Sequence, residues 1–208
     1  MQTANQVTTV TDSTQTLATF VLVLVAASLI SLVSVHLLDR EVNPIKDAVS
    51  DYGARDHAWF YRLAAIWLGF AALLTAVMLS DAMFPKPTET ILCLLVFAAT
   101  RWAITMFPTD LEGEDETSVG KSHLVLAVVA FGSVALAAGL FVASIGSDKF
   151  WDSSFHLLNL IALVLGLAAV LTGAARALEW PIFGLIERAL YLCIFTWFSA
   201  VALILLAA

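Results

Sequence analysis

The chain has 208 residues, of which 61% are hydrophobic and 13% are charged, whereas a soluble domain of this size carries roughly 25% charged residues. The net charge of −7 comes mostly from acidic residues between the apolar runs, and the sequence contains no basic stripe, which excludes a nucleic-acid partner. The composition predicts an integral membrane protein without a separate soluble domain.

Six apolar runs follow one another along the chain, each nearly free of charge over about 17 to 24 residues, which is a membrane-spanning length. We expect spanning helices over residues 17–38, 63–80, 91–107, 123–146, 155–175 and 189–208. The polar N-terminal tail, residues 1–16, carries no Lys or Arg, so the first run is interpreted as a true helix rather than a secretory signal. The sequence therefore predicts an all-α bundle of six spans, with residues 17–208 forming a single transmembrane domain.

The segment NPIKDAVSDYG, between the first two runs, mixes apolar and polar residues. Pro44 can open a short helix, and Val42, Ile45 and Val49 fall roughly on one side of it. Gly53 can end this helix in a left-handed turn. We therefore expect a short amphipathic helix at the membrane interface after the first span.

Lys and Arg are divided unevenly between the two sets of loops. The first, third and fifth loops, which share one membrane face in a six-span chain, carry six of them: Arg40, Lys46, Arg55, Arg62, Lys121 and Arg176. The opposite face carries only Lys86 and Lys149. Because short loops rich in Lys and Arg stay in the cytoplasm, we expect both termini to lie outside, with the protein in the bacterial inner membrane.

The polar residues that could bind or react are concentrated on that same face. We predict a polar pocket there, with ligand-binding residues from three loops and the adjoining helix ends: Ser50, Asp51, Arg101, Asp110, His123, Glu187 and Arg188. Asp51, Asp110 and His123 are the catalytic candidates, because carboxylates and imidazoles act as general acids and bases. The mixed charges suit a zwitterionic or anionic lipid headgroup, whose phosphate would be held by arginine.

Arg101 lies six residues before Phe107, where the third run ends at FPTD. With a rise of about 1.5 Å per residue, it sits roughly 9 Å inside the helix end. An unpaired charge at that depth is costly. Two arrangements remain open: the side chain snorkels to the interface, or it pairs with an acid, of which Glu187 is preferred over Asp110 and Asp51.

Four of these motifs occur in the order and spacing of a known membrane family. NPIKDAVSDYG, FPTD, GKSH and GLIERALYLCIFTW resemble, within residues 17–208, the bacterial family called domain of unknown function 998. The resemblance implies a six-helix integral membrane protein and implies no activity. The signature positions of that family would fall here on Ser50, Asp51, Gly53, Pro108, Thr109, Asp110, Gly120, His123, Glu187 and Arg188.

A second, fainter resemblance is to membrane hydrolases of the alkaline ceramidase kind, which hold zinc with three His near a Ser and an Asp. Here His36, His57 and His123 share a face with Ser50 and Asp51. The chain departs from that group because it lacks two His four residues apart on a late helix. It also has six spans, whereas that group has seven.

Three functions compete at this stage. A non-catalytic module would bind membrane lipids or a membrane-protein partner, including a second copy of the chain. A lipid-acting hydrolase would use Asp and His for acid–base or metal chemistry. A transporter is least favoured, because transport needs polar groups near the midplane and the spans offer scattered Ser and Thr. We expect no metal and no other cofactor, because the His residues lack a recognisable ligand spacing.

Overall fold

The computed structural model describes residues 7–111, 113 and 115–208. In this part of the chain the long helices are α1 (Asp12–Leu38), α2 (Ala58–Ala82), α3 (Thr88–Ala103), α4 (Ser118–Ile145), α5 (Phe155–Ala177) and α6 (Phe183–Leu206). The short 3-10 helix η2 (Ile104–Met106) extends α3. Within the described residues, six helical segments are long and apolar enough to cross a membrane, which confirms the predicted all-α, multi-pass architecture.

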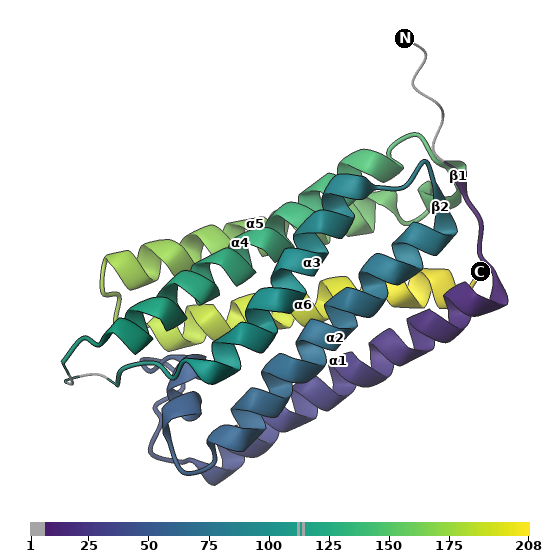
Figure 1. The fold of residues 1–208 in the computed structure, drawn as a ribbon. Helices are drawn as coiled ribbons and strands as arrows, with labels where there is room; N and C mark the ends of the chain where they lie inside the picture. Colours follow the sequence, from purple (N-terminus) through teal and green to yellow (C-terminus); the bar gives the residue numbers. More distant parts are fainter. Residues whose placement is uncertain (1–6, 112, 114) are drawn as a thin grey trace.

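The six helices close into a ring around an aromatic interior (Figure 1). Each helix packs against its neighbours in the sequence, and α1 also packs against α6. Phe97, Phe141, Trp197 and Phe198 are fully buried, and their rings contact one another across α3, α4 and α6. Because these rings fill the middle of the bundle, the buried charged side chains of the helices lie nearer its ends.

The connections between helices are divided between the two ends of the bundle (Figure 1). The α1–α2, α3–α4 and α5–α6 connections lie together at one end, which we call the odd-loop end. The first described residues and the C-terminus, with the α2–α3 and α4–α5 connections, lie at the other. The predicted sharing of one face by loops one, three and five is therefore confirmed.

The opposite end is closed by polar contacts around the first described residues. The strand β1 (Val7–Thr8) pairs antiparallel with β2 (Met83–Phe84). The hydroxyl of Thr8 donates to Asp148 Oδ2 at 2.6 Å and accepts from Trp151 Nε1 at 2.9 Å. These bonds attach the segment before α1 to the α2–α3 and α4–α5 connections.

Within the described residues five of the six long helices begin earlier than the predicted runs, and threonine side chains cap two of them. α1 starts at Asp12 rather than residue 17, since Thr11 Oγ1 accepts from Thr14 N at 3.2 Å. α4 starts at Ser118 rather than residue 123, since Thr117 Oγ1 accepts from Gly120 N at 3.0 Å. Such caps satisfy N–H groups that have no partner inside the helix, so polar residues extend each helix beyond its apolar run.

The short helix predicted after the first span is present as the 3-10 helix η1 (Val49–Ala54). It begins later than expected, because residues 44–48 form turns rather than a helix opened by Pro44. The expected left-handed turn at Gly53 is wrong, since its φ is not positive. Gly53 instead allows close packing: an added Cβ would lie 2.8 Å from Cδ1 of Tyr61.

Candidate functional site

The α1–α2 connection is fastened onto the first turn of α6. Gly184 N donates to Lys46 O at 3.2 Å, and Leu185 N donates to Ile45 O at 3.1 Å. The N–H groups of a first helical turn need partners outside the helix, and the connection supplies them here. Gly184 is required at this contact, because an added Cβ would clash with the backbone carbonyl of Asp47.

Glu187 and Arg188 hold the same connection with their side chains. The buried carboxylate of Glu187 accepts a hydrogen bond from Val49 N at 2.6 Å, at the start of η1. Arg188 donates from Nη1 to Asp47 O at 2.9 Å and from Nη2 to Tyr52 Oη at 3.3 Å. Both residues therefore position the α1–α2 connection on α6.

Arg101, His123 and Glu187 come together inside the bundle, with only 1%, 4% and 4% of their surface exposed. Arg101 lies close enough to His123 and to Glu187 for electrostatic interaction with each. Tyr61 and Tyr191 are also within electrostatic range of Arg101, whose Cζ lies 5.5 Å from the Tyr191 ring centroid. We call these five residues the buried centre.

Arg101 adopts neither of the arrangements expected from the sequence. It does not snorkel, since its side chain is buried. Among the described residues no ion pair joins it to an acid, and the carboxylate of Glu187 is turned to Val49 N instead. The guanidinium Nε and Nη2 atoms of Arg101 are buried without a hydrogen-bond partner.

His123 is held in a defined tautomer by the end of α3. Its Nδ1 lies 2.6 Å from Phe107 O, and a carbonyl oxygen can only accept, so Nδ1 carries the proton. Nε2 of the neutral ring is then an acceptor, and it is buried without a partner. Leaving a buried polar atom without a hydrogen-bond partner destabilises a fold by about 1–3 kcal/mol, and such atoms are uncommon. The unpaired atoms of Arg101 and His123 are therefore candidates for binding a ligand or a buried water.

Asp110 caps the start of α4. Its carboxylate accepts from Thr117 Oγ1 at 2.7 Å and from Thr117 N at 2.8 Å. Gly120 leaves space for it, since a Cβ there would collide with the carboxylate. The two hydrogen bonds from Thr117 lower the pKa of Asp110. The arrangement suits a helix cap better than a proton-transferring group.

Ser50 and Asp51 lie in η1 and are partly exposed. Asp51 Oδ2 accepts from Ala48 N at 3.2 Å. Burial and the neighbouring Asp47 carboxylate raise the pKa of Asp51 to about 6, against opposition from the Ala48 hydrogen bond and two arginines. Asp51 is therefore an acid at this end whose protonation changes close to neutral pH.

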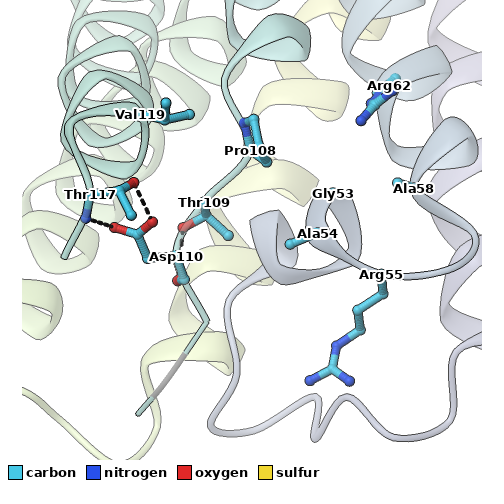
Figure 2. A pocket seen from close by; sticks show the side chains of 10 residues that line it. All are labelled: Gly53, Ala54, Arg55, Ala58, Arg62, Pro108, Thr109, Asp110, Thr117 and Val119. Carbon is cyan, nitrogen blue, oxygen red and sulfur yellow. Dashed lines mark hydrogen bonds between the residues drawn. The ribbon is translucent and has the colours of Figure 1, made fainter. Parts of the chain in front are cut away.

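A groove of about 570 Å³ lies between η1 with the start of α2 on one side and the α3–α4 connection with the start of α4 on the other (Figure 2). Figure 2 shows the carboxylate of Asp110 bonded to Thr117 at one edge, with Arg55 and Arg62 on the opposite side. The lining residues are Gly53, Ala54, Arg55, Ala58, Arg62, Pro108, Thr109, Asp110, Thr117 and Val119.

The predicted ligand-binding residues are divided between four places at the odd-loop end. Asp110 lines the groove, and Arg101, His123 and Glu187 belong to the buried centre. Ser50 and Asp51 lie in η1, the 3-10 helix whose last residues line the groove. Arg188 lies on α6 under the α1–α2 connection.

The His residues of this end have separate partners. His36 Nδ1 bonds to Tyr52 Oη at 2.6 Å, and His57 Nδ1 lies 2.5 Å from Asp39 Oδ1, whereas His123 bonds to the α3 carboxyl end. Within the part of the chain that the structure describes, no three His, Cys, Asp or Glu side chains are grouped so that they could hold a metal ion.

A protein-family model matches residues 17–204, which is almost the whole chain. The chain belongs to the DUF998 family. The family is described as a protein of unknown function, so membership adds no activity. No curated protein and no solved structure matches the sequence. The family resemblance seen in the four motifs is thereby confirmed.

Two residues of the buried centre in this DUF998 protein, Tyr61 and Tyr191, were not among the predicted site residues. The spacing of Tyr191 offered a signal, since it lies four residues after Glu187 and therefore on the same helical face. Tyr61 offered none, because it lies on α2 and only the packing of the helices brings it within electrostatic range of Arg101. The motif glycines Gly53 and Gly120 prove to be points of close packing.

Proposed function

We propose that this DUF998 protein binds the headgroup of an anionic membrane lipid in the groove at the odd-loop end, without covalent chemistry. The observation that supports it is the charge of the groove. Arg62 lines it without an ion pair among the described residues, whereas Arg55 is paired with Glu41 at 3.2 Å and the carboxylate of Asp110 is bonded to Thr117. Arginine is well suited to phosphate, because its planar fork of donors matches the phosphate oxygens.

The position of the groove suits a lipid as well. It lies where the spans end, the level at which headgroups meet protein, and Ala54, Ala58, Pro108 and Val119 offer apolar contacts. A hydrolase is a weaker candidate, because Asp110 is bonded as a cap and the His residues have separate partners.

We also propose that the odd-loop end faces the cytoplasm of a bacterial inner membrane. The support is the uneven distribution of Lys and Arg between the two ends, described from the sequence. The cytoplasmic leaflet carries anionic lipids, so a cationic groove would meet its ligand there. The proposed partners are membrane lipids; a second copy of the chain or another membrane protein is the alternative.

The first prediction tests the groove. Purified protein in nanodiscs of phosphatidylcholine with or without phosphatidylglycerol should retain phosphatidylglycerol preferentially, as counted by native mass spectrometry. Arg62→Gln should weaken this retention roughly tenfold, since losing a hydrogen bond to a charged group costs about 1.5–3 kcal/mol. The matched control is Arg176→Gln, which removes an exposed charge at the end of α5, outside the groove. Equal losses in both variants would show a non-specific surface effect and contradict the proposal.

A further inference from the structure

We propose that the buried centre is a binding site for a phosphate monoester, held between Arg101 and His123. The inference rests on the proposed function, since a headgroup bound in the groove lies next to the buried centre, from which η1 and the Tyr61 ring separate it until they move. It adds the class of phosphate that is recognised: a terminal phosphate with a free O–H, rather than a phosphodiester.

The buried centre lies about one helical turn deeper than the groove. Val119 lines the groove, and His123 follows four residues later on the same face of α4. Ala58 lines the groove, and Tyr61 follows three residues later on α2. A rise of about 1.5 Å per residue makes these steps about 6 Å and about 4.5 Å. Gly53, from the groove wall, packs on the Tyr61 ring, so η1 and this ring lie between the groove and the buried centre.

The unpaired atoms define the hydrogen bonds that a ligand must make. Nε and Nη2 form one edge of the Arg101 guanidinium, and two parallel donors of this kind suit two oxygens of one oxyanion. His123 Nε2 is an acceptor while Nδ1 donates to Phe107 O, so it needs an O–H on the ligand. Among the described residues no ion pair joins Glu187 to this edge, and its carboxylate accepts from Val49 N instead.

A phosphate monoester in its monoanionic form meets all three requirements, with two acceptor oxygens and one O–H on the same phosphorus. Its second proton is lost near a pH of about 6, so this form is present close to neutral pH. A carboxylate or a phosphodiester offers acceptors only and leaves His123 Nε2 unpaired. A single water would also meet these bonds, by accepting from both donors of Arg101 and donating to His123 Nε2, so equal binding of a phosphate monoester and a phosphodiester would leave water as the occupant.

The second prediction compares two lipids in phosphatidylcholine nanodiscs: phosphatidic acid, a phosphate monoester, and phosphatidylglycerol, a phosphodiester. Wild-type protein should prefer phosphatidic acid roughly tenfold, a difference of about 1.4 kcal/mol. His123→Asn keeps an amide donor for Phe107 O and removes the acceptor at Nε2, so the preference should disappear. His123→Gln, which keeps an acceptor near the Nε2 position, should retain part of it. Arg101→Lys keeps the charge without the two-donor edge and should also lose the preference.

The outcomes separate this inference from the proposed function. If Arg62→Gln weakens both lipids but wild-type protein binds them equally, the groove stands and the phosphate-monoester site is wrong. If the preference depends on His123 and not on Arg62, the site stands and the groove proposal fails. A preference unchanged in His123→Asn overturns the site and leaves its unpaired atoms as a packing feature.

Two further experiments use wild-type protein alone, so they do not depend on whether a variant folds. With wild-type protein, the preference for phosphatidic acid should shrink as the pH rises above about 7, because the ligand loses the O–H that His123 needs. A preference independent of pH would overturn the inference even if the variants unfold. Competition with inorganic phosphate and glycerol 3-phosphate identifies the source: displacement of phosphatidic acid by either at similar concentration points to a soluble ligand, and none points to the lipid.

Discussion

Two aspartates at the same end of the bundle have opposite electrostatic surroundings. Asp110 accepts two hydrogen bonds from Thr117, and these lower its pKa. Asp51 is partly buried, and this burial together with the neighbouring Asp47 carboxylate raises its pKa to about 6. A carboxyl group is therefore not a functional candidate by its position on a membrane face alone. What its oxygens contact decides whether it caps a helix or titrates near neutral pH.

The third prediction concerns the titration of Asp51. Its folded pKa of about 6 exceeds the reference value of 3.8, so the folded protein holds this proton more tightly than the unfolded chain. The stability conferred is present below the unfolded pKa and is lost as the pH rises through the folded pKa. Asp51→Asn, which keeps an acceptor for Ala48 N, should raise the thermal unfolding temperature in detergent at about pH 8 and change it little at about pH 4.

The groups facing Asp51 account for this direction: Asp47 raises its pKa, and Arg55 and Arg188 lower it by less than burial raises it. The matched control is Asp110→Asn. Because the pKa of Asp110 is lowered, its ionised form stabilises the fold above the unfolded pKa, so this variant should lower the unfolding temperature at about pH 8. The same effect of Asp51→Asn at both pH values would contradict the prediction.

At the scale of elements, the start of α6 depends on a segment far away in the sequence. The α1–α2 connection supplies carbonyl acceptors to Gly184 and Leu185 and receives the side chains of Glu187 and Arg188. α6 has no side-chain cap of its own at Ile182. Formation of its first turn is therefore coupled to the position of η1, and hence to the cover over the buried centre.

The fourth prediction tests this coupling with two glycine substitutions. Gly184→Ala should lower the unfolding temperature in detergent, because the new Cβ meets the backbone carbonyl of Asp47, which cannot rotate away as a side chain would. Gly173→Ala in α5 is the control: nothing lies within 4 Å of its added Cβ, and Ala favours a helix by about 1 kcal/mol over Gly. It should leave the unfolding temperature unchanged or raise it. Equal behaviour of the two variants would argue against the docked arrangement.

At the scale of the whole molecule, closure of the ring separates an apolar outside from an interior that is aromatic in the middle and polar near the odd-loop end. Outward positions such as Ile30, Val128 and Leu163 are exposed, as expected for contact with lipid tails. Arg101, by contrast, is buried near polar residues of three other helices, α2, α4 and α6. The ring thus gives ionisable groups within the spans a protein surrounding instead of a lipid one.

The fifth prediction concerns orientation. Because the odd-loop end carries most of the loop Lys and Arg, it should face the cytoplasm, which places Ala208 outside. Alkaline phosphatase fused after Ala208 should therefore be active, and a fluorescent protein fused there should be dark. The control is the same pair of fusions within the α1–α2 connection, where the signals should be reversed. An inactive phosphatase with a bright fluorescent fusion at Ala208 would invert the orientation and leave the shared end intact.

Composition and run length by themselves determined the architecture. Apolar segments of about 20 residues must satisfy their backbone groups internally when they cross a membrane, so six of them specify an all-α bundle. Parity also determined that three connections share one end, since successive spans alternate in direction. Hydropathy did not predict where α1 and α4 begin. Their capping residues, Thr11 and Thr117, lie outside the apolar runs and act through side-chain hydrogen bonds.

Only the tertiary structure decided how the polar residues are paired. Similar depths along α3 and α6 suggested that Arg101 pairs with Glu187. Depth does not show how each helix is rotated about its axis, or which hydrogen-bond donors a neighbouring connection presents. The carboxylate of Glu187 bonds to Val49 N, and Arg101 lies against Tyr191. The groove likewise forms where the packed fold brings η1 and the start of α2 opposite the α3–α4 connection, segments that are not adjacent in the sequence.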